Sequence, residues 1–192
     1  MIAFVKGNFV DKTPSHVVVE VNGVGYDLQI SLHTYSAIAD KESGKLHTYL
    51  QITENNQTLF GFAEQAEKEI FLQLISVSGI GAATARVMLS GMKPVEIAKA
   101  IAQGNTKLLA TIKGIGKKTA ERLIVELRDK LSKQSIETSN IAPESVIEED
   151  AINALIALGI NRVAAENIVK KIILSSPNAT LEQIIKHALK NL

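Results

Sequence analysis

The chain has 192 residues and a formal net charge of +1, and 46% of its residues are apolar, as is usual for globular proteins. It contains no cysteine, which excludes disulfides and thiolate metal sites and favours a reducing compartment. Its longest uncharged run, residues 70–85, is too short to span a membrane, and the N-terminus lacks a signal-peptide pattern. We therefore expect a cytoplasmic protein that does not contact membranes.

The small net charge conceals a basic centre between acidic ends. Residues 63–134 contain 12 Lys and Arg against 7 Asp and Glu, whereas residues 1–62 contain 4 against 6, and residues 135–192 contain 5 against 7. Within the centre, residues 104–134 alone contain 8 basic and 3 acidic side chains. This uneven distribution indicates an anionic partner for the central segment.

Residues 1–62 have the alternating pattern of short β-strands. Val17, Val19 and Val21 alternate with Val18, Glu20 and Asn22, and Asn22-Gly23 is typical of a tight β-hairpin turn. Similar alternation continues through residues 26–30 and 46–52, with a short helix expected between them. The segment predicts a small closed barrel such as an OB-fold, because closure removes exposed strand edges; a three-stranded sheet is the alternative.

Residues 63–134 change to helical periodicity and contain an internal repeat. Residues 74–89 read LISVSGIGAATARVML, and residues 109–124, displaced by 35 positions, read LATIKGIGKKTAERLI. In both copies a helical pattern enters Gly-Ile-Gly and a second helical pattern leaves it. We therefore predict a helical domain with a tandem helix-hairpin-helix, whose last helix ends near Leu131.

The two Gly-Ile-Gly turns are candidate phosphate sites. Glycines let the backbone turn tightly, and the N–H groups at the start of the following helix carry partial positive charge. A single such turn is most often only structural, but its duplication beside a basic cluster favours nucleic-acid binding. The turn residues that we predict to contact DNA are Gly79, Ile80, Gly81, Gly114, Ile115 and Gly116.

Side chains make the two copies unequal. The second turn is followed by three further candidate DNA contacts: Lys117, Lys118 and Arg122. Positive side chains at a helix N-terminus are unfavourable, because the helix dipole is also positive there. An anionic ligand would account for their placement. The first copy has Ala82, Ala83 and Val87 at the equivalent positions, and Arg86 is its only nearby cation. We include Arg86 among the predicted DNA contacts.

The last part of the chain is predicted to contain a flexible linker, residues 135–143, followed by a small three-helix bundle, residues 144–192. The linker region is rich in Ser, Thr and Asn and has no apolar period. The bundle contains three helical patterns, of which the last begins with a possible capping box, Thr180 and Gln183. A small bundle on a tether favours docking over catalysis. The chain is thus predicted to be a multidomain α+β protein.

Several kinds of chemistry are excluded or disfavoured. The GIGKKT stretch lacks the first Gly and the Ser or Thr of a nucleotide-binding P-loop, so no ATPase is expected. The four histidines have no ligand spacing, and we predict no catalytic site, metal or cofactor. Aromatic residues make up only 4% of the chain, which disfavours single-strand binding by base stacking. Contacts to the backbone of double-stranded DNA fit better.

The order of these parts closely resembles the RuvA family, the Holliday-junction-binding subunits of the bacterial branch-migration complex. The resemblance covers essentially the whole chain, and its most specific stretch is GIGKKTAERLIVEL in residues 114–127. It implies a homotetramer or octamer that binds four-way DNA junctions in recombination, repair and the SOS response. It also implies that the motor ATPase RuvB docks on the C-terminal bundle and consumes the ATP, with the resolvase RuvC as a further partner.

The resemblance also implies roles for residues outside the repeat. Family members carry an acidic pair on a barrel hairpin, the acidic pin that separates strands; here Glu54 and Asn55 occupy these positions, so one carboxylate is missing. The motor-binding surface is implied to lie near Leu155, Leu158 and Ile160. The alternative for these three residues is an ordinary place in the bundle core.

Two other functional classes stay open at this level. A glycosylase or nuclease could use the hairpins to hold DNA. Resemblance to glycosylases of the hairpin class leaves Asp129 as the only candidate catalytic carboxylate, and the carboxylate cluster of a metal-dependent nuclease is absent from the sequence. A protein-interaction adaptor could use them only for packing.

Overall fold

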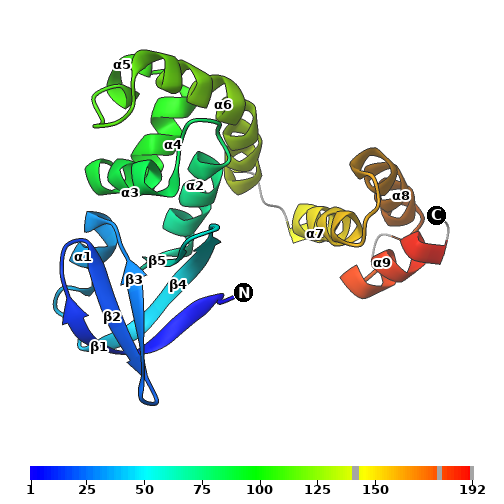
Figure 1. Ribbon diagram of the computed structural model, residues 1–192. Helices are drawn as coiled ribbons and strands as arrows, with labels where there is room; N and C mark the ends of the chain where they lie inside the picture. Colours follow the sequence, from blue (N-terminus) through cyan, green and yellow to red (C-terminus); the bar gives the residue numbers. More distant parts are fainter. Residues whose placement is uncertain (140–142, 177–178, 191–192) are drawn as a thin grey trace. The chain divides into compact units, whose positions relative to one another are not determined.

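The computed structural model describes residues 1–139, 143–176 and 179–190, with the backbone alone for residues 129–139 and 143–146. The chain divides into two compact units, Met1–Lys133 and Gln134–Leu192. The first contains a β-barrel and a helical region, and the second is a helical bundle (Figure 1). The predicted α+β class is therefore confirmed.

The N-terminal barrel closes in the strand order β1-β2-β3-β5-β4. Its strands are β1 (Phe4–Lys12), β2 (His16–Val21), β3 (Val24–Gln29), β4 (Ser43–Ile52) and β5 (Gln57–Phe62), with helix α1 (Leu32–Ile38) between β3 and β4. All neighbouring strands pair antiparallel except β3 and β5, whose parallel pairing completes the barrel.

The barrel follows from the alternation seen in the sequence. Val17 and Val19 on β2 and Leu28 on β3 are fully buried inside it. Asn22 and Gly23, with φ of 50° and 86°, form the tight turn between these strands, as predicted. The closed barrel is thus confirmed, and the alternative of a three-stranded sheet is wrong.

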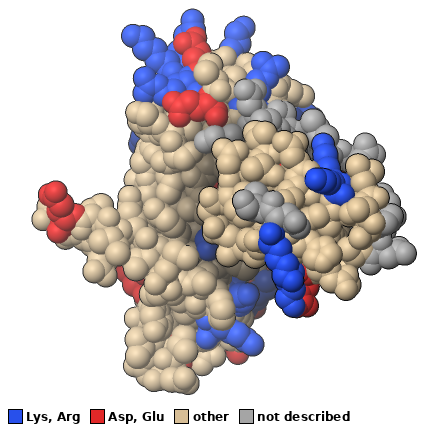
Figure 2. Space-filling model, turned by 90° about the vertical axis from the view of Figure 1, so that its right-hand side faces the viewer, with Lys and Arg blue, Asp and Glu red and all other residues tan. Residues whose placement is uncertain are grey.

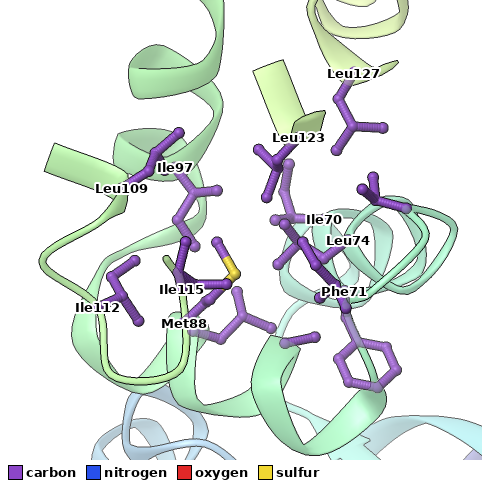
Figure 3. Packing of buried hydrophobic residues seen from close by; sticks show 14 of the residues in the cluster. Ile70, Phe71, Leu74, Met88, Ile97, Leu109, Ile112, Ile115, Leu123 and Leu127 are labelled. Carbon is purple, nitrogen blue, oxygen red and sulfur yellow. The ribbon is translucent and has the colours of Figure 1, made fainter. Parts of the chain in front are cut away.

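Helices α2 to α6 form the helical region beside the barrel. They are α2 (Gln65–Ile75), α3 (Ala82–Gly91), α4 (Pro94–Ala102), α5 (Thr106–Leu109) and α6 (Lys117–Ser139). Phe71 of α2 is fully buried, and its ring centroid lies 4.9 Å from that of Phe62 and 5.1 Å from that of Phe60, both on β5. One apolar core therefore joins the helices to the end of the barrel. Figure 3 shows the helical part of this core, including Phe71.

A buried carboxylate adds a polar joint at the same place. Glu67 on α2 is fully buried and accepts hydrogen bonds from the hydroxyls of Ser31 and Thr34, the latter at 2.6 Å. Thr34 also accepts a hydrogen bond from the N–H of Ala63, at 2.9 Å. Burial raises the pKa of Glu67, and the two hydroxyl hydrogen bonds oppose this shift.

The last helix of this region is longer than expected. The sequence predicts an end near Leu131, but α6 continues to Ser139 and covers part of the predicted linker. Residues 132–139 contain neither Gly nor Pro, so no residue in them breaks the helix. Residues 140–142, also predicted as linker, lie outside the described residues.

The C-terminal unit packs α7 (Pro143–Ala157), α8 (Arg162–Ser175) and α9 (Leu181–Lys190) around a small apolar core. The predicted capping box is confirmed: Thr180 N–H donates to Gln183 Oε1 at 3.0 Å, and Gln183 N–H donates to Thr180 Oγ1 at 3.4 Å. Arg162 on α8 bridges to Glu149 on α7 at 3.2 Å.

We predict that Glu67 makes the stability of the first unit fall as pH rises. Because its pKa is raised in the folded state, the folded chain binds the proton more tightly than the unfolded chain. The free energy of unfolding should fall as pH rises from the ordinary glutamate pKa through the raised value. Urea titrations across this range should show the fall in wild type and a flatter profile in Glu67→Gln.

A second substitution serves as the control for this prediction. Glu67→Ala leaves the hydroxyls of Ser31 and Thr34 without their acceptor, so it should lower the free energy of unfolding by about 2–4 kcal/mol at low pH. The loss should become smaller as pH rises, because the variant lacks the titrating carboxyl group. Identical pH profiles for wild type and Glu67→Gln would contradict the account.

Candidate nucleic-acid interface

The first Gly-Ile-Gly stretch forms a tight turn between α2 and α3. The N–H of Val77 donates to the carbonyl of Leu74 at 3.1 Å, and the N–H of Ile80 donates to the carbonyl of Val77 at 3.0 Å. Gly81 is the N-cap of α3, and its carbonyl accepts from the N–H of Ala85 at 2.9 Å. The chain thus reverses and starts a new helix within a few residues.

The second stretch repeats this geometry between α5 and α6. The N–H of Ile112 donates to the carbonyl of Leu109 at 3.3 Å, and the N–H of Ile115 donates to that of Ile112 at 3.0 Å. The carbonyl of Gly116 accepts from the N–H of Ala120 at 2.9 Å. Every bond lies 35 positions after its counterpart, so the sequence repeat corresponds to a structural repeat.

Each residue of the turn has a distinct role. Gly79 and Gly114 both adopt φ of +92°, in the left-handed region that side chains disfavour. Ile80 and Ile115, each 4% exposed, instead point into the helical core, where Figure 3 shows Ile115 beside Met88. The burial of the isoleucine holds the turn in place and leaves the glycines on the surface.

The surface of each turn is open and offers backbone N–H groups. A Cβ added at Gly81 or Gly116 would meet no atom within 4 Å. Within the described residues, no side chain caps the N-terminus of α3, so its first N–H groups lack the partner that a capping side chain would supply. An exposed helix N-terminus with free amides can bind a phosphate.

Cations gather around the second turn. Lys117, Lys118 and Arg122 are exposed on the first turns of α6, and Figure 2 shows the corresponding concentration of Lys and Arg at the top of the molecule. Lys117 Nζ lies 4.0 Å from Glu121 Oε1, at the outer limit of an ion pair. Lys107, which the sequence reasoning did not single out, lines the same pocket as Lys117; the basic bias of residues 104–134 was the signal for it.

Two arginines have partners that the sequence did not predict. Arg122 Nη1 donates to the carbonyl of Ser78 in the first turn, at 3.2 Å, and so connects the two hairpins. Arg86 Nη1 donates to the carbonyl of Ser15 at 2.9 Å and to Gln29 Oε1 at 2.5 Å. Arg86 is half-buried against the barrel, and its contact with DNA stays a prediction.

The β4–β5 hairpin carries the candidate acidic pin. β4 and β5 pair up to Ile52 and Gln57, and the N–H of Thr53 closes the loop on the carbonyl of Asn56 at 2.9 Å. Glu54 and Asn55 are exposed at the tip of this loop.

The three candidate partner-binding residues in the bundle differ in their environment. Leu155 is fully buried in the bundle core, and Ile160 packs against that core while partly exposed. Leu158 has 61% of its surface exposed. Of the three, Leu158 therefore offers the most apolar surface to a partner.

The described part of the chain contains neither a candidate metal-binding group nor a candidate membrane-spanning helix. No group of three His, Asp or Glu side chains there could hold a metal ion. The side chain of Asp129 lies outside the described residues. None of the helices, as far as the structure describes them, is long and apolar enough to cross a membrane.

The two glycines of the second turn should respond differently to substitution. Gly114→Ala forces a side chain into the left-handed region and should lower the free energy of unfolding by about 1–2 kcal/mol. Gly116→Ala meets open space without that strain, so it should change stability by less than about 0.5 kcal/mol. Urea denaturation of both variants measures the difference; equal losses of stability would contradict the assigned geometry.

Comparison with known proteins matches all three parts of the chain. Residues 1–61 match the family described as RuvA N terminal domain, and residues 71–129 match the SAM-like Helix-hairpin-helix tandem. Residues 146–192 match the RuvA, C-terminal domain.

Full-length relatives agree with these matches. The Holliday junction branch migration complex subunit RuvA of Christiangramia forsetii is 47% identical over 193 residues, and that of Flavobacterium psychrophilum is 48% identical over 193 residues, with 100% of each chain covered in both cases. The protein of the same name from Cytophaga hutchinsonii is 45% identical over 197 residues, with 99% of each chain covered. The repeated turns, the barrel and the bundle thus belong to one known arrangement, and the chain is a member of the RuvA family.

Proposed function

We propose that this chain binds four-way DNA junctions through backbone phosphates and is a non-catalytic subunit of a branch-migration complex. The observation that carries the proposal is the Gly-Ile-Gly turn, which occurs twice with the same hydrogen bonds, starts a new helix each time and packs into one apolar core. The name of its relatives, Holliday junction branch migration complex subunit, supports the same function.

The repeated turns are suited to DNA shape rather than sequence. Amides and lysines at a helix N-terminus contact phosphates, and phosphate contacts carry no direct base information. Each contact is weak. Once one hairpin binds one arm of a junction, however, the other hairpins are held near the remaining arms, which raises their effective concentration there. We therefore propose a homotetramer, alone or as an octamer, with its hairpins distributed over the four arms.

The three parts of the chain would divide this function. We assign oligomerisation and the acidic pin to residues 1–62, and DNA binding to residues 63–134. The bundle at residues 144–192 would dock the motor ATPase RuvB, with Leu158 as its most exposed apolar contact. RuvC is a further proposed partner. The chain itself would need no cofactor, since ATP is used by the motor.

The first test compares a four-way junction with a linear duplex of the same sequence at several salt concentrations. Wild type should bind the junction much more tightly than the duplex. The logarithm of its association constant should fall with the logarithm of the salt concentration, with a slope of about −0.9 for each phosphate that the protein neutralises. The double variant Lys117→Ala/Lys118→Ala should bind more weakly, with a slope shallower by about 0.9 for each phosphate that the variant no longer neutralises.

The bundle offers a matched control for this double variant. Lys170 and Lys171 are also adjacent, exposed lysines on a helix, so Lys170→Ala/Lys171→Ala removes the same charge. This control should retain the wild-type slope. Equal affinity of wild type for junction and duplex would refute junction binding, and equal slopes for the two double variants would refute the role of the second turn.

The second test concerns the acidic pin. Carboxylates at the tip of the β4–β5 loop would repel phosphates at the crossover, and this chain has one, Glu54, beside the neutral Asn55. Asn55→Asp should raise the fluorescence of 2-aminopurine placed at the crossover, which reports unpaired bases, and Glu54→Gln should lower it. Unchanged fluorescence in both variants would contradict the proposed role.

A further inference from the structure

Helix α3 has a polar edge that faces the barrel. Arg86 and Ser90 lie four residues apart on this helix and therefore on the same side of it. Arg86 donates to Ser15 and Gln29 of the barrel, and Ser90 Oγ accepts from the backbone N–H of Leu32 at 3.1 Å. Ser90 also donates to the carbonyl of Arg86 at 2.8 Å, which ties the two contacts together.

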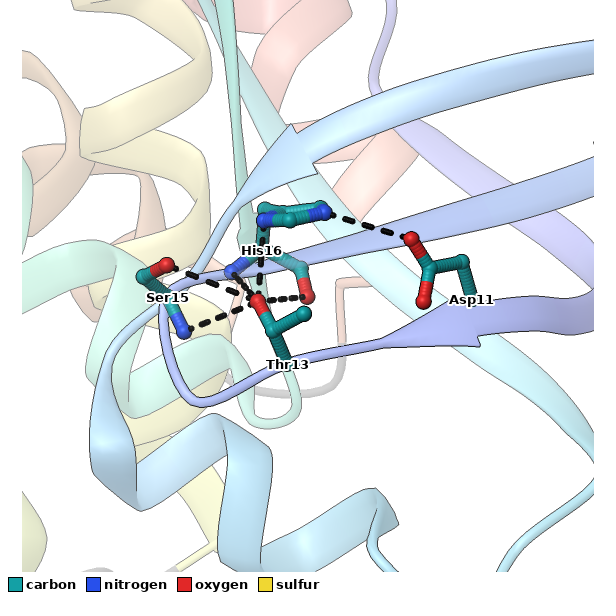
Figure 4. Close-up of polar contacts among 4 residues, drawn as sticks. All are labelled: Asp11, Thr13, Ser15 and His16. Carbon is teal, nitrogen blue, oxygen red and sulfur yellow. Dashed lines mark hydrogen bonds and ion pairs between the residues drawn. The ribbon is translucent and has the colours of Figure 1, made fainter.

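The barrel presents an ordered acceptor to this edge. The carbonyl of Ser15 accepts from both Arg86 and the N–H of Ile30, the latter at 3.0 Å. The loop around Ser15 is itself cross-linked, because Thr13 Oγ1 lies 2.8 Å from His16 Nδ1 and accepts from the N–H of His16 at 3.1 Å (Figure 4). His16 Nε2 lies 3.4 Å from the carboxylate of Asp11 (Figure 4).

The second copy of the motif lacks this polar edge. The positions equivalent to Arg86 and Ser90, 35 residues later, are Glu121 and Val125. Val125 has 77% of its surface exposed, and Glu121 is also exposed. The contacts of Arg86 and Ser90 are therefore not required to build a helix-hairpin-helix, and they belong only to the copy beside the barrel.

One more contact links the first hairpin to the second. Arg122 of α6 donates to the carbonyl of Ser78, which directly precedes Gly79 in the first turn. Hydrogen bonds thus hold α3 to the barrel loop at one end of the first hairpin and hold the first turn to the cationic helix of the second hairpin at the other.

We propose that Arg86 is a positioning residue: with Gln29, Ser15 and Ser90 it fixes the angle of the paired hairpins relative to the barrel. This inference rests on the proposed function, because the angle matters only if the barrel orders several chains around one junction. A duplex engages the hairpins of one chain at a time and does not test their angle. A junction requires the hairpins of several chains to be correctly directed at once.

The decisive variant is Gln29→Met, which removes an acceptor of Arg86 without removing any charge. Full-length protein is titrated with the junction and with the duplex at several salt concentrations. The preference for the junction should fall about tenfold, the expected effect of removing a hydrogen bond to a charged donor, while duplex affinity and the salt slope stay at wild-type values. Hydrogen exchange of the free protein should be faster in residues 82–90.

The matched control is Gln65→Met, the same substitution at an exposed site whose side chain bonds only locally, to Glu69 at 3.1 Å. An unchanged junction preference in Gln29→Met would overturn the inference. A shallower salt slope in Arg86→Met beside that result would make Arg86 a phosphate contact instead.

A second variant and a second measurement keep the outcomes distinct. If Gln29→Met does not fold, Ser90→Ala replaces it, since this change removes the acceptor of the Leu32 N–H and keeps the packing of α3. If wild type shows no junction preference, the proposed function fails. Hydrogen exchange still tests the joint in that case, because unchanged exchange in residues 82–90 of the variants would show that it does not hold α3.

Discussion

The structure depends on one constraint in each hairpin: a glycine with positive φ beside a buried isoleucine. Gly79 and Gly114 take the same φ, and Ile80 and Ile115 are equally buried. The isoleucine holds the turn against the core, so the following residues must leave as a helix with its first amides on the surface. The candidate phosphate sites are thus a consequence of core packing.

The two copies use the same turn for different tasks. The exit helix of the first copy is hydrogen-bonded to the barrel and carries small residues, Ala82 and Ala83, next to its turn. The exit helix of the second copy has no such contact with the barrel among its described residues, and it carries lysines at the same positions. One hairpin is therefore suited to fixing geometry and the other to supplying charge. The difference in sequence between the two copies thus corresponds to a difference in structure, because Arg86 of the first copy contacts the barrel.

The sequence predicted what depends on local patterns. The alternation around Val17, the Asn22-Gly23 turn and the repeat of Gly-Ile-Gly are each determined within a few residues, and the structure agrees with them. It could not predict what long-range packing decides. Arg86 reaches Ser15, 71 positions away, so its proximity to the turn alone suggested a DNA contact. Leu155 and Leu158 look alike in the sequence, but only the fold buries one and exposes the other. The end of α6 at Ser139 was missed because polar residues without Gly or Pro are compatible with both helix and linker.

The central claim is that the turns act together, several chains at a time, on one branched DNA molecule. Native mass spectrometry of the full chain mixed with a four-way junction, and separately with a linear duplex of equal length, tests it most directly. The account predicts a complex of four chains, or of eight, on each junction, and no complex of that stoichiometry on the duplex at the same salt concentration. A single bound chain on both DNAs would contradict it.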